Sequence, residues 1–227
     1  MHCRVKLMMS FLRNLVQRWV FFPRIPSLAT MSAALVLLNC SVTFRNVWPT
    51  LSIRPTSEIS LELAIVLVLL AVLKGRGKFV SLNFVRGLSI IWSFLIVGRY
   101  IEITTRSLYG RDVNVYWDFR HVPSVGAMFA TVADPWLVII GVGGAILVPF
   151  VVYFASFWAF TQIVNSVSRP GPRAGLAAVG TAVLLVFGFA QLGGRVADGV
   201  RFADPVAPAY ARESFEFVYE MTGAGVA

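Results

Sequence analysis

The sequence predicts an all-α, polytopic membrane protein whose chain crosses the bilayer as about five transmembrane helices. Three observations support this prediction. First, 57% of the 227 residues are hydrophobic and 14% are charged, whereas a soluble domain has roughly 45–50% and about 25%. Second, the mean hydropathy is +0.75, and five apolar segments approach the roughly 20 residues that span a bilayer. Third, the short segments on one side of this pattern carry only basic charge.

The chain opens with a basic, amphipathic segment over residues 1–26. Leu12, Leu15, Val16 and Trp19 recur at helical spacing among basic residues, a pattern typical of a helix that lies in the membrane interface. A signal peptide also starts with basic residues before an apolar run, but this segment is long, lacks a small-residue cleavage site and precedes further spans. We therefore expect a retained cytoplasmic leader.

Five apolar segments follow the leader, and each is expected to form one membrane-spanning helix. The second is short, and the third carries Arg86 near its start. The fourth, at 30 residues, would measure roughly 45 Å against a hydrocarbon core of roughly 30 Å. Pro149 near its middle predicts a kink or tilt. The segments lie at about residues 27–44, 59–73, 79–98, 135–164 and 174–193.

The distribution of charge predicts the orientation. With a cytoplasmic N-terminus, the inner segments 1–26, 74–78 and 165–173 hold ten basic and no acidic residues. The outer segments hold nine basic and all eleven acidic residues. Short inner connections rich in Lys and Arg set orientation, so we expect the C-terminus on the periplasmic side. The net charge of +9 is thus explained by the membrane, and no nucleic-acid partner is expected.

The expected domain organisation has three parts. The leader covers residues 1–26, the five-span membrane domain covers 27–193 with an outer loop at 99–134, and a periplasmic tail or linker covers 194–227. Within the tail, apolar residues at helical spacing predict a short amphipathic helix at about 209–221.

The residues needed for several kinds of chemistry are absent. His2 and His121 lie outside the predicted spans, which excludes a haem held by two histidines between helices. Cys3 and Cys40 form neither a C-x-x-C motif nor a four-cysteine metal site. The sequence has no P-loop, no G-x-S-x-G and no paired carboxylates within a span. We expect no catalytic residue, no metal site and no cofactor in this chain.

Charged and aromatic residues are concentrated in the outer loop. Arg99, Glu102 and Arg106 are three and four positions apart, which places them on one helix face if the third helix continues outward. One interpretation is a docking or head-group-binding surface, because arginines suit bidentate recognition of phosphate. The other is a solvated helix end flanked by aromatic anchors. The docking candidates are Arg99, Glu102, Arg106, Arg111, Asp118 and His121, and the interfacial anchors are Tyr109, Tyr116 and Trp117.

Two charged positions invite a more specific function that the sequence does not favour. Asp118 and His121 could be metal ligands or an acid–base pair, but two ligands are too few for a closed site. A hydrogen-bonded turn leading into Pro123 explains them more simply. Arg86 within the third span is explained by a side chain that snorkels to the cytoplasmic interface.

Four short motifs of the outer loop carry a family resemblance: GRY at 98–100, LYGR at 108–111, NVYWD at 114–118 and HVP at 121–123. Together they resemble the connection between transmembrane helices in membrane-anchored members of the alkaline phosphatase/sulfatase superfamily, such as lipoteichoic-acid-synthase-like and phosphoethanolamine-transferase-like proteins. Residues 202–212 are similar to the linker that leads into the catalytic domain of those proteins. The resemblance implies about five spans in a bacterial inner membrane, and an outer domain that acts on a phospholipid or glycan head group.

The sequence departs from that family because nothing in it corresponds to the catalytic domain, with its nucleophile and its metal-binding Asp and His residues. We therefore expect a non-catalytic inner-membrane domain that anchors and docks a periplasmic sulfatase- or phosphatase-like partner domain. The expected partners are the lipid bilayer and a protein on the periplasmic side. A small accessory subunit of a larger membrane complex is the alternative. A small transporter is a further alternative, although polar intramembrane residues are scarce.

Overall fold

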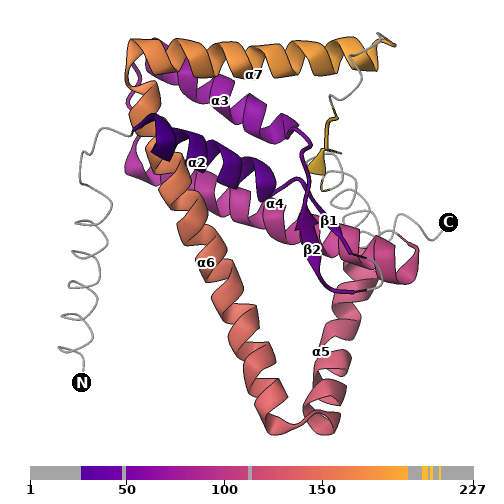
Figure 1. Cartoon of the computed structure of the whole chain (residues 1–227). Helices are drawn as coiled ribbons and strands as arrows, with labels where there is room; N and C mark the ends of the chain where they lie inside the picture. The colour runs from indigo at the N-terminus through magenta and orange to yellow at the C-terminus, as the bar shows by residue number, and fades with distance from the viewer. Residues whose placement is uncertain are drawn as a thin grey trace, which may run out of the picture.

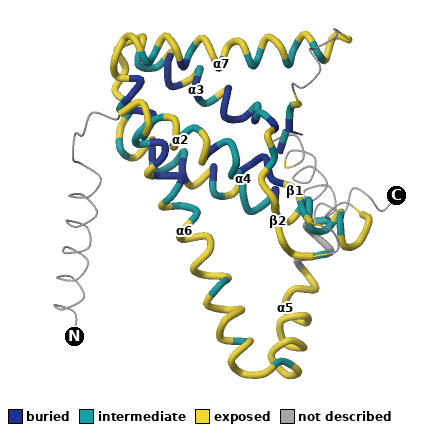
Figure 2. Tube along the Cα trace, viewed as in Figure 1, coloured by how far each residue is buried: buried dark blue, intermediate teal, exposed yellow. Residues whose placement is uncertain are grey.

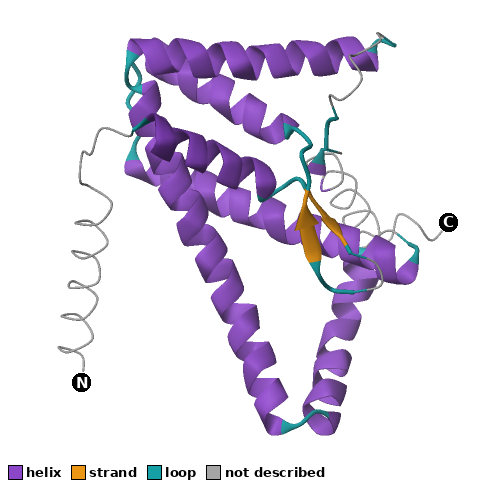
Figure 3. Ribbon diagram, viewed as in Figure 1, coloured by secondary structure: helices purple, strands orange, loops and turns teal. Residues whose placement is uncertain are grey.

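The protein is described by a computed structural model, and it is mostly helical (Figures 1 and 3). The helices are α2 (Leu28–Cys40), α3 (Leu61–Gly75), α4 (Leu82–Tyr109), α5 (Val115–Val132), α6 (Pro135–Val167) and α7 (Pro170–Gln191). Strands β1 (Phe44–Asn46) and β2 (Ile53–Pro55) pair antiparallel between α2 and α3. The structure describes residues 27–47, 50–111, 114–193, 201–203, 205–206 and 210. The predicted leader and the predicted tail helix at 209–221 lie outside these residues, apart from Tyr210.

Side-chain caps and prolines fix where the helices begin. Ser27, Ser60 and Ser81 precede α2, α3 and α4, and each hydroxyl accepts a hydrogen bond from the backbone N–H three residues later, at 3.1–3.2 Å. Such bonds satisfy donors that a helix start would otherwise leave unpaired. Pro135 and Pro170 occupy the first positions of α6 and α7, where a missing N–H costs nothing.

The core is a bundle of α2, α3, α4, α7 and the second half of α6. Helix α3 packs against α7, and both α2 and α4 pack against α6. Trp92 of α4 meets Phe160 of α6 edge to face with ring centroids 5.4 Å apart, and its indole N–H donates to Ser41 at 3.0 Å. Figure 2 shows the buried residues gathered in this bundle. One aromatic side chain therefore ties α4 to both α2 and α6.

The bundle has two chemically different ends (Figure 1). We call one the basic end: it holds the α3–α4 and α6–α7 connections, and the Arg173 guanidinium donates to the Lys74 carbonyl across them at 3.3 Å. We call the other the β-hairpin end: it holds β1, β2, the start of α3 and residues 201–206. The two short connections predicted to face the cytoplasm thus lie together.

Helix α5 and the first half of α6 project away from the bundle (Figures 1 and 2). The buried residues of α6 begin only at Ser156, and α5 exposes apolar side chains such as Val125, Met128 and Phe129. Segment 99–134, predicted as an outer connection, is thus largely helical. Helix α4 contains no proline and continues to Tyr109, and Gly110, which adopts a φ of 65°, ends the helix.

Three helices in the described part of the chain, α4, α6 and α7, are long and apolar enough to cross a membrane. Helices α2 and α3 have 13 and 15 residues, which is short for a full crossing. Helix α6 runs unbroken over 33 residues and contains Pro149. The structure is therefore that of an all-α membrane protein, and the five crossings with their orientation stay a prediction.

Candidate functional site

The C-terminal part of α4 brings three of the docking candidates together. Glu102 lies between two arginines: one carboxylate oxygen is 3.8 Å from Nη1 of Arg99, and the other is 3.3 Å from Nη2 of Arg106. The continuous helix confirms that the three residues share a face. Their exposure differs, since the side chain of Arg106 is 52% exposed and that of Arg99 only 6%. The cluster therefore has one surface cation and one buried cation.

Arg99 is the unusual member of this cluster. Its Nε–H has no hydrogen-bond partner among the described residues, although the atom is buried. A guanidinium has five N–H donors and no acceptor, and a buried donor without a partner costs free energy. Among the described residues, the Arg99 Nε–H therefore stays without an acceptor, at an atom that its neighbours cover.

Arg111 and Asp118 form a second pair at the joint between α4 and α5. Nη1 and Nη2 of Arg111 donate to the two carboxylate oxygens of Asp118 at 3.2 and 2.6 Å, a bidentate geometry. The backbone N–H of Asn114 donates to the same carboxylate at 3.1 Å. The hydrogen bond from Arg111 lowers the pKa of Asp118, and the same hydrogen bond raises the pKa of Arg111. This pair orients the start of α5 relative to α4.

Asp118 and His121 lie in different surroundings on α5. The Asp118 carboxylate is engaged by Arg111 and Asn114, while His121 is exposed on α5. The described residues contain no group of three or more potential metal ligands. The hydrogen-bonded turn predicted before Pro123 is replaced by helix, since α5 continues through that proline.

The three predicted aromatic anchors lie at the same joint. Tyr109 ends α4 with 71% of its surface exposed, and the Arg111 guanidinium lies 6.0 Å from the centre of its ring. Tyr116 and Trp117 belong to α5, but their side chains lie outside the described part of the structure. The anchoring role of all three stays a prediction.

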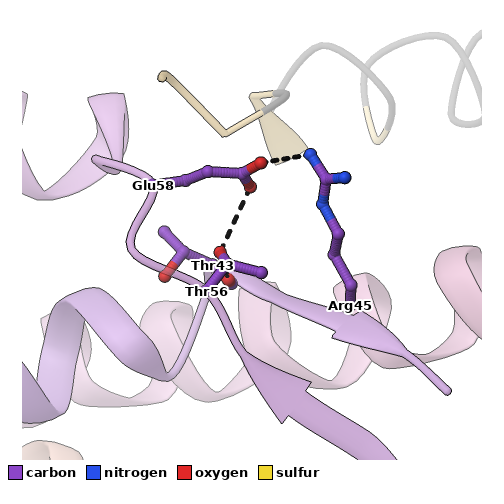
Figure 4. A network of polar contacts seen from close by, with 4 residues as sticks. All are labelled: Thr43, Arg45, Thr56 and Glu58. Carbon is purple, nitrogen blue, oxygen red and sulfur yellow. Dashed lines mark hydrogen bonds and ion pairs between the residues drawn. The ribbon is translucent and has the colours of Figure 1, made fainter. Parts of the chain in front are cut away.

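A buried polar network at the β-hairpin end was not predicted from the sequence. Glu58 is 4% exposed, and its carboxylate pairs with Arg45 of β1 and accepts from the Thr56 hydroxyl at 3.2 Å (Figure 4). The Thr56 hydroxyl also contacts the carbonyl of Thr43. These contacts hold β1 and β2 against the segment that leads into α3.

Asn39 at the end of α2 links that helix to the same segment. Its amide group donates to the Glu58 carbonyl at 2.8 Å, and its oxygen accepts from the Ser60 N–H at 3.0 Å. Both polar atoms of one side chain thus bind backbone groups about twenty positions away. The end of α2 and the start of α3 are fixed to one another by this side chain.

Residues 201–203 and Val206 are hydrogen-bonded to this network. The Ile59 N–H donates to the Arg201 carbonyl at 3.0 Å, and the Ala203 N–H donates to the Ile59 carbonyl at 3.1 Å. Glu62, 8% exposed, accepts from the Val206 N–H at 2.6 Å with one oxygen and from the Ser60 hydroxyl at 3.0 Å with the other.

Tyr210 connects the segment after α7 to α4. Its hydroxyl contacts the Phe94 carbonyl, and a Cβ added to Gly98 would overlap its ring. Burial raises the pKa of Tyr210. The segment after α7 therefore reaches both the start of α3 and the α4 face that leads to Arg99 and Glu102.

The sequence carried only a weak signal for this network. Glu58 and Glu62 flank the start of an apolar segment, and an acidic residue in a first helical turn is common because it complements the helix dipole. Their partners Asn39 and Val206 lie 19 and 144 positions away. No local pattern reveals pairings over such separations.

Comparison with known proteins gives no match: no family model, no curated protein and no solved structure matches the chain. The arrangement at the β-hairpin end is one of ion pairs and hydrogen bonds, and Arg99 on α4 is a buried arginine with an unpartnered Nε–H among the described residues. Such groups can bind and position other groups.

Proposed function

We propose that this chain is a non-catalytic domain of a bacterial inner membrane that anchors and docks a periplasmic partner of the sulfatase or phosphatase type. The observation that carries the proposal is the cluster of Arg99, Glu102 and Arg106 on α4, in which the Arg106 side chain is 52% exposed and pairs with Glu102. The cluster lies on the last turns of α4, a helix of the bundle.

The surroundings of Arg99 support a docking role. The second arginine pair, Arg111 with Asp118, follows on the same outward path of the chain and is half exposed. Residues 201–206 and Tyr210 are held at the same end of the molecule. A partner domain that is connected to this end, or that binds to it, would contact arginine side chains held in fixed positions.

The test uses the full chain purified from its native membrane in mild detergent, with co-purifying chains identified by mass spectrometry. We expect a stoichiometric phosphatase- or sulfatase-like chain. The double variant Arg106→Gln/Arg111→Gln should lower its recovery by about tenfold, since each exposed charge pair contributes up to about 1 kcal/mol. Arg86→Gln is the matched control, because Arg86 lies on the same helix at the basic end and contacts only Asn83 at 3.4 Å in the described contacts.

Equal recovery of the partner from both variants would contradict the docking role of α4. Recovery of unrelated membrane subunits in place of a phosphatase-like chain would favour the second candidate, an accessory subunit of a larger complex. The projecting α5–α6 hairpin favours that candidate specifically. Apolar side chains such as Val122 and Met128 are 58% and 63% exposed on α5, and contiguous exposed apolar surface marks protein or membrane contacts.

A further inference from the structure

An apolar groove runs between α2, α3 and α7, away from the docking candidates. It has a volume of about 610 Å³. Its walls are side chains such as Met31, Leu35, Leu67 and Val183. Its polar groups gather at one end, where α2 ends and α3 begins. These are Asn39, Thr56, Ser57 and Ser60.

One wall of the groove is formed by a helix that is long and apolar enough to cross a membrane. Its α7 wall extends from Pro172 to Val183, inside one of the three helices long and apolar enough to cross a bilayer. Met31 and Pro172 mark the groove toward the basic end, and Asn39 and Ser60 mark it at the β-hairpin end. One end of the groove is therefore apolar and near the basic end, and the other is polar and near the hairpin.

The groove is open to its surroundings. Val36 and Val179 line it and are 61% and 58% exposed, so an occupant can enter from the side. Where the helices cross a membrane, that side faces the hydrocarbon of the bilayer. An extended peptide is excluded, because backbone N–H and C=O groups at bilayer depth must be paired internally.

Water is an equally poor occupant of the apolar part. A water molecule needs two to four polar partners to be held in a protein interior, and the polar lining groups are confined to the β-hairpin end. A slim occupant without hydrogen-bonding groups along its length remains, and the bilayer supplies it as the hydrocarbon chain of a lipid.

We propose that the groove between α2, α3 and α7 binds one hydrocarbon chain of a membrane lipid, with the polar part of the lipid at the β-hairpin end beside the exposed Ser57 and the chain end near Met31 and Gly175. This inference does not depend on a periplasmic partner. It assigns the three helices a lipid-binding role of their own, separate from the face that carries Arg99.

Two glycines of α7 provide a matched pair of variants. Gly175 lines the groove, and Gly188 lies further along the same helix outside it. A Cβ added to either one meets no atom within 4 Å. Gly175→Leu should therefore place a side chain in the groove without a clash at its Cβ, while Gly188→Leu adds the same side chain elsewhere. Val179→Phe fills the middle of the groove as a second variant, since Val179 lines it and is 58% exposed.

The experiment uses the full chain in phosphatidylglycerol vesicles that contain a small fraction of phosphatidylglycerol with a photoreactive diazirine at the end of one acyl chain. After irradiation, adducts are mapped by mass spectrometry. We expect adducts near residues 31–35 and 172–176, and about tenfold fewer in Gly175→Leu, since blocking contact with about two methylene groups weakens binding by that factor. Gly188→Leu should match the wild type.

Three results would overturn the proposal. One is adducts spread evenly over the exposed face of α6 with no enrichment in the groove. Another is an unchanged yield in both Gly175→Leu and Val179→Phe, each shown to be folded by its unfolding temperature in detergent. The third is cross-linking of the groove to a second protein chain in place of lipid.

Discussion

Both carboxylate oxygens of the buried Glu62 accept hydrogen bonds. An oxygen left unpaired at this position would cost free energy because it is removed from water. It sits in the first turn of α3, where a negative charge complements the helix dipole. One oxygen accepts from the Ser60 hydroxyl, which also caps the helix, and the other accepts from the Val206 N–H. The Glu62 side chain thus stabilises the start of α3 and also holds Val206, which follows α7 in the chain.

We predict that Glu62→Ala releases residues 201–206 from the bundle. The Val206 N–H loses its acceptor in a buried position, which costs about 1–3 kcal/mol. Glu62→Gln is the control, because its amide oxygen can still accept from Val206. Backbone hydrogen exchange at Ala203 and Val206 measures the effect: it should become faster in Glu62→Ala and stay close to wild type in Glu62→Gln. Unchanged exchange in the alanine variant would show that the Ile59 bridge alone holds the segment.

At the scale of elements, the contact between α3 and α7 depends on a small residue. A Cβ added to Gly180 would lie 2.9 Å from Cγ2 of Val68 and 3.0 Å from the Ala64 carbonyl oxygen. The carbonyl belongs to a helix backbone and cannot move alone, so the two helices would have to separate. Close approach through small residues is a common way for membrane helices to associate.

We predict that Gly180→Ala destabilises the bundle by about 1–3 kcal/mol, the usual cost of overpacking. Gly188→Ala is the matched control on the same helix, where a Cβ meets nothing within 4 Å and the better helix propensity of alanine adds up to about 1 kcal/mol. Thermal unfolding in one detergent should therefore shift down for Gly180→Ala and shift up or stay level for Gly188→Ala. A rise in both variants would mean that α3 and α7 adjust freely.

The elements differ in how far the sequence could predict them. Helices α6 and α7 lie close to the apolar segments predicted for them, because a long hydrophobic run has few alternatives to a helix. Helix α5 was missed, since Pro123 and the charges around it are typical of a loop. The groove and the Asn39–Glu58–Glu62 network depend on helices that are distant in sequence, so no local pattern encodes them.

At the scale of the whole molecule, the open question is whether α2 and α3 cross the bilayer. At 1.5 Å per residue they measure roughly 20 and 23 Å, against a core of roughly 30 Å. Yet α2 packs against α6 and α3 against α7, and both partners are candidate spans. Short helices at bilayer depth are accommodated by local thinning of the membrane and by polar structure at their ends, such as the Glu58 network. We therefore expect both helices to cross.

Single cysteines can decide between five crossings and three. If α2 and α3 cross, position 52 lies on the opposite side from positions 79 and 168; if only α4, α6 and α7 cross, all three positions lie on one side. Ser52, Phe79 and Ser168 are exposed, so each can be replaced by Cys after the native Cys3 and Cys40 are changed to Ser. The inner connections rich in Lys and Arg predict that an impermeant maleimide added to spheroplasts labels only Ser52→Cys. Labelling of Phe79→Cys and Ser168→Cys should require lysis, whereas the same behaviour at all three positions, whether they are labelled before lysis or protected until lysis, would reduce the membrane domain to three spans.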